Sequence, residues 1–398
     1  MQASPSTSAA PTPANRLVSL DAYRGAIMLF MASSGFGFAE MARKFPESGF
    51  WKFLGFHTSH VAWVGGSAWD MIQPAFMFMV GVAMPFSLLR RATDGQPYAK
   101  QLSHACWRAL VLIALGVFLA SRGRAQTNFL FTNVLAQIGL GYVFLFVLAG
   151  RKRWEQITAG ILLLAGTWFA FVLYPAPGPA PDLKMAGLKS ADAEGLMSGF
   201  FAHWSMGLNS AAAFDRWFLN LFPTEKEWVF HSGGYQTLNF VPALVTMLLG
   251  LLAGQVLRGE QSQREKIAWL FKWGAGCVAL GLLAGFTVCP IVKRIWTPSW
   301  TLYSGGIVLW LLALFYWAVE VQGWRRWTFP LVVVGMNSIA IYLLHELLQR
   351  WIGDTLKVHL GKEIFSGDYG PVLQRVSVLL VLWLVCWWMY RRKIFLRI

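Results

Sequence analysis

HTSHVAWVGGSAWD, residues 57–70, runs directly into MIQPAFMFMVGVAMPFSLL, residues 71–89, and these two adjoining segments indicate the class of protein. The second part is free of charged residues, and an apolar run of this length is typical of a helix that crosses a bilayer. The first part places two imidazoles, a glycine pair and a carboxylate at the mouth of that helix. Such groups are costly next to hydrocarbon, so their presence there favours a functional role.

The composition of the whole chain agrees with this interpretation. Hydrophobic residues make up 56% of the 398 residues and charged residues 13%, whereas soluble domains carry about 25% charged residues. The sequence therefore predicts an all-α integral membrane protein with about ten transmembrane helices. Windows of about 19 residues place these helices near residues 17–39, 67–89, 106–122, 132–150, 156–175, 237–257, 268–291, 300–320, 329–349 and 372–390.

The spans group into two sets around one long connection. We expect helices 1–5 over about 17–175 and helices 6–10 over about 237–391, with a small external loop region at 176–236 between helices 5 and 6. Residues 1–15 are rich in Ala, Ser, Thr and Pro and lack an apolar core, so they predict a disordered cytoplasmic tail. Residues 16–398 are then a single transmembrane domain.

The distribution of basic residues predicts the orientation. Lys and Arg are concentrated in the short loops on the side of the N-terminus, which places both termini in the cytoplasm. The net charge of +15 needs no nucleic acid to explain it, because anionic membrane lipid is a sufficient partner.

The four cysteines lie in apolar spans without CxxC spacing, so we predict no metal site. Walker, HExxH and GxSxG patterns are absent from the sequence, which argues against ATP-driven pumps, zincins and serine hydrolases of known pattern.

The candidate catalytic residues are His60 and Asp70. His60 can serve as a general base or a nucleophile, and Asp70 can orient and charge it. His57 and Trp63 lie beside His60 and are candidate substrate contacts. In the alternative interpretation the histidines are interfacial residues, and Asp70 is a first-turn acid favoured by the helix dipole.

Two basic groups are candidates for a phosphorylated cofactor. Arg24 lies three residues after Asp21, so the two can pair on one helical face, or Arg24 can bind a phosphate. The second group precedes the predicted span 300–320 and consists of Lys293, Arg294, Trp296 and Ser299. This group can bind a phosphorylated cofactor or a sugar, or it can belong to the aromatic belt at the membrane interface.

Polar residues at two further spans are candidate substrate contacts. Gln236 and Asn239 open the span at 237–257, where helix capping is the alternative. Asn337, Ser338 and His345 lie in the span at 329–349. An amide in the middle of a span must find a partner inside the bundle, which can be another helix or a substrate.

These segments resemble the heparan-α-glucosaminide N-acetyltransferase family of membrane acyltransferases, and within it the bacterial NagX-type proteins. The resemblance runs in order along residues 17–345. It departs from the family at Ser33-Ser34-Gly35, where the family often carries an asparagine. The matching segments are LDAYRG (20–25), HVAW (60–63) with Asp70, QPAFMFMVG (73–81), NVLAQ (133–137), QTLN (236–239), KRIWTPS (293–299) and VGMNSIAIY (334–342).

The resemblance implies a transmembrane acyltransferase domain over residues 16–398 that moves an acetyl group from cytoplasmic acetyl-CoA to the amine of a glucosamine-type sugar on the periplasmic side. The family's catalytic histidine maps onto His60, which either accepts the amine proton directly or becomes acetylated; we favour the direct route. The resemblance also implies a bacterial inner-membrane protein that forms a homodimer. The alternative function is an inner-membrane transporter of amino sugars such as N-acetylglucosamine.

Overall fold

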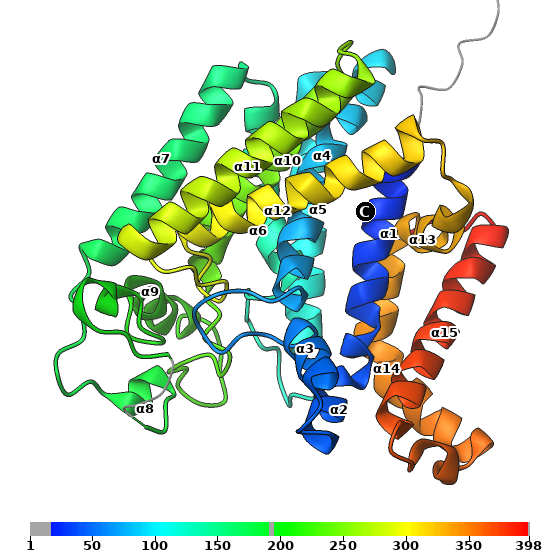
Figure 1. Ribbon diagram of the computed structural model, residues 1–398. Coiled ribbons are helices and arrows are strands. Elements are labelled where there is room, and N and C mark those ends of the chain that lie inside the picture. The colour runs from blue at the N-terminus through cyan, green and yellow to red at the C-terminus, as the bar shows by residue number, and fades with distance from the viewer. Residues whose placement is uncertain (1–16, 191–194, 397–398) are drawn as a thin grey trace, which may run out of the picture.

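The computed structural model describes residues 17–190 and 195–396, and the predicted tail at 1–15 lies outside them. In the described part of the chain, all regular elements are helices (Figure 1), which confirms the predicted all-α fold. Over residues 17–190 and 195–396, seven helices are long and apolar enough to cross a membrane, and nine spans result if each of two bent helix pairs counts as one. The chain is therefore a multi-pass membrane protein.

The helices follow one another from α1 to α15. Their bounds are α1 Val18–Ala32, α2 Phe38–Lys44, α3 Gly49–His57, α4 Ile72–Thr93, α5 Tyr98–Ala120, α6 Val134–Ala149, α7 Arg153–Val172, α8 Leu183–Ala186, α9 Ser210–Leu219, α10 Phe240–Arg258, α11 Gln263–Thr287, α12 Pro298–Tyr316, α13 Phe329–Gly335, α14 Ser338–Leu360 and α15 Gly370–Arg391.

Each of the ten predicted spans coincides with a helix or a helix pair, but the count of ten is not confirmed. The span predicted at 132–150 is α6, which has 16 residues and is shorter than the roughly 20 residues that a bilayer requires. The spans predicted at 17–39 and 329–349 are each broken. The first bends by 42° between α1 and the following helix, and the second by 68° between α13 and α14.

The core of the bundle is the contact between α4 and α10. A Cβ atom on Gly81 would lie 1.8 Å from the Met247 carbonyl oxygen, and one on Gly250 would lie 2.0 Å from the Phe78 carbonyl oxygen. The two glycines therefore let the helix backbones touch, which is a common way to pack helices in membranes. The pairs α5–α6 and α11–α12 also pack together, as do α1–α13 and α14–α15 (Figure 1).

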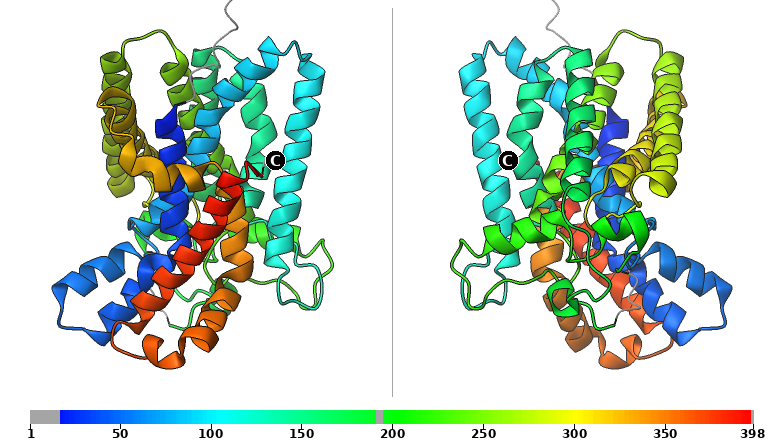
Figure 2. Two further views of the ribbon diagram at one scale, coloured as in Figure 1. Left: turned by 90° about the vertical axis from the view of Figure 1, so that its right-hand side faces the viewer. Right: turned by 90° about the vertical axis from the view of Figure 1, so that its left-hand side faces the viewer.

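The two ends of the bundle differ in construction. One end, which we call the His60 end, carries α2, α3, the loop at 58–68 and the long connection between α7 and α10 with α8 and α9 (Figure 2). This connection occupies the region predicted as an external loop at 176–236. The opposite end, which we call the Arg24 end, carries the start of α1 and the turns α4–α5 and α10–α11.

Candidate active site

The loop between α3 and α4 carries His60 and is anchored at two points. The Gly65 amide donates to the Ile291 carbonyl oxygen at 2.8 Å, which ties the loop to the segment before α12. The indole of Trp63 is buried and donates to the Trp204 carbonyl oxygen at 3.1 Å. The loop is therefore fixed against two distant parts of the chain, and His60 has a defined position.

His60 is hydrogen-bonded to Asp70. The His60 Nδ1 lies 2.6 Å from Oδ1 of Asp70, a carboxylate that is almost fully buried. The other carboxylate oxygen, Oδ2, accepts from the Ser67 amide at 3.1 Å, the Ser67 hydroxyl at 3.0 Å and the Val61 amide at 3.2 Å. These donors hold the carboxylate in one orientation, and the carboxylate in turn orients the imidazole.

The hydrogen bond to Asp70 determines which nitrogen of His60 is available. Because Nδ1 donates to the carboxylate, the neutral ring carries no proton on Nε2. Desolvation of the ring lowers the pKa of His60 below its usual value, and the charge of Lys293 lowers it further, while the hydrogen bond to Asp70 opposes both. The lowered pKa favours the neutral form of the imidazole, and 40% of its side chain is exposed. His60 has the properties of a general base.

Lys293 completes this group from the segment before α12. Its Nζ lies 3.6 Å from Oδ1 of Asp70 and 3.3 Å from Nδ1 of His60, and it donates to the Tyr235 hydroxyl at 3.0 Å. Lysine is a donor without an acceptor, so its short distance to the protonated Nδ1 reflects their shared acceptor on Asp70. A buried cation beside a buried carboxylate reduces the cost of burying each charge.

Arg294 joins the His60 loop to the segment that precedes α10. Its guanidinium donates to the Gly233 carbonyl oxygen at 2.7 Å and to the Val61 carbonyl oxygen at 3.1 Å. The Asn239 amide donates to the Arg294 carbonyl oxygen at 2.8 Å. The guanidinium of Arg294 therefore holds two backbone segments around His60.

Three residues predicted to bind cofactor or substrate are buried behind this group. Trp296 donates to Thr246 Oγ1 at 3.3 Å, and the Ser299 hydroxyl donates to the Pro290 carbonyl oxygen at 2.7 Å. The Gln236 amide donates to Asn209 Oδ1 at 2.9 Å. All three lie at the His60 end, where their polar groups bond to other parts of the protein.

The other predicted residues are distributed over both ends. His57 ends α3, and its Nδ1 accepts from the Ala68 amide at 3.4 Å. Asn337 lies at the break between α13 and α14 and bonds to the backbone of Ile394 and Leu396, each at 3.1 Å. His345 lies 3.0 Å from the Ser34 hydroxyl. The remaining two, Arg24 and Ser338, line a cavity at the opposite end of the bundle from Lys293.

This cavity, which we call the Arg24 cavity, has a volume of about 640 Å³. One wall is a single face of α4, formed by Phe76, Met79, Val80, Ala83, Met84, Ser87 and Arg91. Fifteen residues of helix span about 22 Å, so this apolar wall rises from Arg91 towards the His60 end. Phe76 lies six residues from Asp70 in sequence, which is about 9 Å along a helix.

The Arg24 cavity carries more basic than acidic side chains. Arg24, Arg91 and Arg108 line it together with His104, Asp21 and Asp94. Arg24 also pairs with Asp21 at 3.7 Å, as its position on the same helical face predicts. The guanidinium of Arg108 donates to the Tyr142 hydroxyl at 3.1 Å. Arg91 and Arg108 contribute to the loop charge that predicts the orientation, and neither is among the site residues that the sequence predicts. The signal that could have found Arg108 is a cation two residues into the predicted span 106–122.

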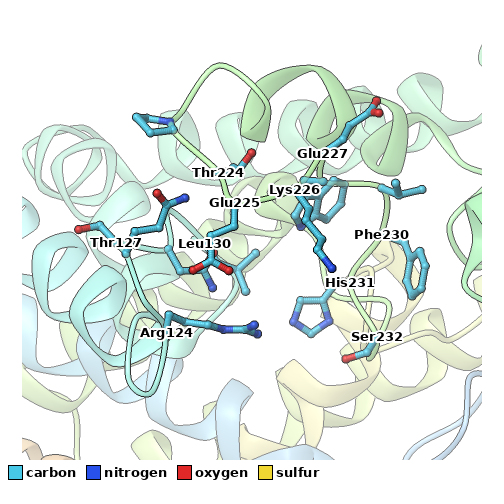
Figure 3. Close-up of a pocket in the computed structure, with 15 residues that line it drawn as sticks. Arg124, Thr127, Leu130, Thr224, Glu225, Lys226, Glu227, Phe230, His231 and Ser232 are labelled. Carbon is cyan, nitrogen blue, oxygen red and sulfur yellow. The ribbon is translucent and has the colours of Figure 1, made fainter.

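A second cavity of about 510 Å³ opens at the His60 end (Figure 3). Arg124, Glu225 and Lys226 point into it, and His231 closes it on one side. The His231 ring stands perpendicular to the ring of Tyr235, with the centroids 5.5 Å apart. Burial and the charge of Arg294 lower the pKa of His231 to about 4. Tyr235 packs against His231 on one side and accepts a hydrogen bond from Lys293 on the other, so it lies between this cavity, which we call the His231 cavity, and Lys293.

Neither cavity offers a metal centre. Over residues 17–190 and 195–396, the structure contains no group of three or more His, Cys, Asp or Glu side chains placed to hold a metal ion. The polar groups at the His60 end are suited instead to moving a proton, and those of the Arg24 cavity to binding an anion.

Comparison with known proteins points to acyl transfer. A family model described as an acyltransferase domain matches residues 193–391. Heparan-alpha-glucosaminide N-acetyltransferase of Mus musculus is 25% identical over 437 residues, which cover 97% of this chain and 61% of the relative. The enzyme of the same name from Homo sapiens is 24% identical over 428 residues, covering 96% and 60%. The chain thus spans about three fifths of the length of these relatives.

Proposed function

The chain belongs to the acyltransferase domain family, and we propose on this basis that it transfers an acetyl group from acetyl-CoA to the amine of a glucosamine-type sugar. The observation that carries the proposal is that one helix, α4, begins beside the His60–Asp70 pair and also forms a wall of the Arg24 cavity. Asp70, two residues before α4, orients His60, and the cavity follows one face of α4 to Arg91.

The lining of the Arg24 cavity is suited to binding acetyl-CoA as the acetyl donor. Acetyl-CoA combines several phosphates with a long, narrow arm that ends in the thioester. The arginines of the cavity match the phosphates, and the apolar face of α4 between Phe76 and Met84 matches the arm. Arg24 is then a donor-binding residue as predicted, whereas Lys293 and Arg294 serve the acetyl-transfer end.

The chemistry proposed for His60 is base-assisted acyl transfer. The sugar amine attacks the thioester carbonyl carbon, and its proton passes to Nε2 of His60 as the new carbon–nitrogen bond forms. The carbon–sulfur bond then breaks, and His60 returns the proton to the departing thiolate. Asp70 stabilises the imidazolium that exists between these two steps.

The acceptor is proposed to enter at the His60 end. The His231 cavity lies beside Tyr235 and carries polar and aromatic side chains, which suits a sugar. In this proposal the Arg24 end faces the cytoplasm of a bacterium and the His60 end the periplasm, with both termini on the cytoplasmic side. A homodimer in this inner membrane is proposed from the resemblance to the family, and the mass of the detergent-solubilised protein tests it.

The test is the release of CoA by the purified full-length protein in detergent, supplied with acetyl-CoA and glucosamine. We expect release that depends on glucosamine and is lost in His60→Ala. His359→Ala removes an exposed imidazole at the end of α14 and should behave as wild type. The enzyme proposal fails if no amino sugar elicits CoA release while proteoliposomes take up N-acetylglucosamine, which is the result that a transporter gives.

A further inference from the structure

A second polar cluster at the His60 end is formed by α1 and α14. The Ser34 Oγ lies 3.0 Å from Nε2 of His345, and the Gln349 side-chain amide donates to the same oxygen at 2.5 Å. The other ring nitrogen of His345, Nδ1, lies 3.7 Å from Oε1 of Glu346. The hydroxyl thus lies within hydrogen-bond distance of the imidazole, as in a serine–base pair, and the Glu346 carboxylate lies beside the ring but beyond hydrogen-bond distance of Nδ1.

The backbone that carries this hydroxyl is strained. Residues 34–37 all have positive φ, and they include two non-glycine residues, Ser34 at 49° and Phe36 at 52°. A left-handed conformation costs a non-glycine residue about 1–2 kcal/mol, and such strain concentrates at functional sites, including the sharp turns that present serine nucleophiles. A Cβ atom on Gly35 would lie 2.8 Å from the Thr58 carbonyl oxygen, so the backbone of the turn packs directly against the loop that follows α3.

The hydrogen bonds leave the Ser34 oxygen able to react. When the neutral ring of His345 carries its proton on Nδ1, the Ser34 hydroxyl donates to Nε2. Gln349 uses one lone pair of the oxygen, and the other remains for attack. The preceding residue, Ser33, provides a contrast, because it is fully buried and its hydroxyl donates to the Phe30 carbonyl oxygen at 2.6 Å. Ser34 is half-buried.

We propose that Ser34 is a nucleophile, activated by His345, that accepts acyl groups from thioesters or activated esters. The Ser34 oxygen bonds to the carbonyl carbon, and its proton passes to Nε2 of His345. The carbon–sulfur or carbon–oxygen bond then breaks, and the leaving group takes the proton from His345. Water releases the acid from the acyl-serine by the same route. This activity does not depend on the transfer proposed at His60.

The experiment is covalent labelling of the full-length protein in detergent with an alkyl fluorophosphonate. This reagent bonds through phosphorus to an activated serine oxygen as fluoride leaves, and peptide mass spectrometry then identifies the modified residue. We expect one adduct on Ser34. Ser34→Gly, which suits the left-handed backbone, should abolish labelling, and His345→Gln should slow it by roughly 100-fold or more, because it removes the base.

Ser33→Ala is the matched control and should be labelled at the wild-type rate. His60→Ala should also be labelled at the wild-type rate, so that failure of the acetyl transfer and failure of the Ser34 nucleophile are distinguishable. The proposal is overturned if the wild-type protein carries no adduct on Ser34, or if the adduct forms as fast in His345→Gln.

Discussion

Lys293 Nζ lies 3.6 Å from Oδ1 of Asp70, and both side chains are almost completely buried. The same carboxylate oxygen lies 2.6 Å from Nδ1 of His60. One acidic oxygen therefore faces a permanent cation and a titratable ring at once. The proton affinity of His60 depends on both of these neighbours, and each can be removed separately.

Asp70→Asn should nearly abolish CoA release while the protein remains folded. The amide keeps the shape of the carboxylate, but it neither fixes the tautomer of His60 nor stabilises the imidazolium. We expect kcat to fall by about 100-fold or more, in keeping with the loss of assisted proton transfer. The measurement is CoA release with glucosamine as acceptor. An unchanged kcat would show that Asp70 has no role in the reaction.

Lys293→Met should shift the pH dependence of the reaction upward. The Lys293 charge lowers the pKa of His60, so its removal raises that pKa and moves the acidic limb of the pH profile of kcat/KM to higher pH. The variant should also be destabilised by about 3 kcal/mol, because Asp70 loses a buried partner. A purely structural lysine would lower stability and leave the acidic limb where it was.

The wild-type pH profile should have its acidic limb below pH 6.5. Desolvation lowers the folded-state pKa of His60 below the usual 6.5, and the base acts in its neutral form. Activity is therefore complete at neutral pH and declines as the pH falls through the lowered pKa. The free energy of unfolding should also fall as the pH is lowered. The imidazole of His60 has a higher pKa in the unfolded chain than in the folded chain, so acid favours the unfolded chain. An acidic limb above pH 6.5 would contradict this assignment.

Arg91→Gln should weaken binding of the donor and leave the chemical step intact. Arg91 lines the Arg24 cavity at the end of α4, and a lost charged hydrogen bond costs about 1.5–3 kcal/mol. We expect KM for acetyl-CoA to rise by roughly 10-fold or more, with kcat within about twofold. Arg153→Gln, an exposed cation at the start of α7, is the control. Equal effects of the two substitutions would indicate a general loss of positive charge.

The sequence predicts the helices well, because a long apolar run has few alternatives in a membrane protein. It does not predict the break at Ser34–Gly37, because the left-handed turn depends on contacts with Thr58 and His345 that lie elsewhere in the chain. The break at Asn337 likewise depends on the backbone of Ile394 and Leu396. Hydropathy predicts where a helix can lie in the membrane, but it does not predict where tertiary contacts interrupt that helix.

The sequence likewise predicts part of the candidate site, namely residues close together in the chain, but not the contacts between distant segments. The ten-residue spacing between His60 and Asp70 is visible in sequence, and the structure joins the two side chains. In sequence, Lys293 is a candidate for binding a phosphorylated cofactor or a sugar, or a member of the interfacial belt, and the structure places its Nζ 3.6 Å from Asp70. Tyr235 was missed as a partner of Lys293 because nothing in sequence indicates a contact across 58 positions. The catalytic and binding roles of these residues remain predictions that the experiments above test.

The distance in sequence between His60 and Lys293, 233 positions, has a consequence for biosynthesis. At roughly 5–20 residues per second, a ribosome needs about 10–50 seconds to travel between them. During that interval α4 enters the membrane with an acid whose cation has not yet been made. The active group is therefore completed only after α11 has been synthesised, so nascent chains released before that point carry Asp70 without its lysine.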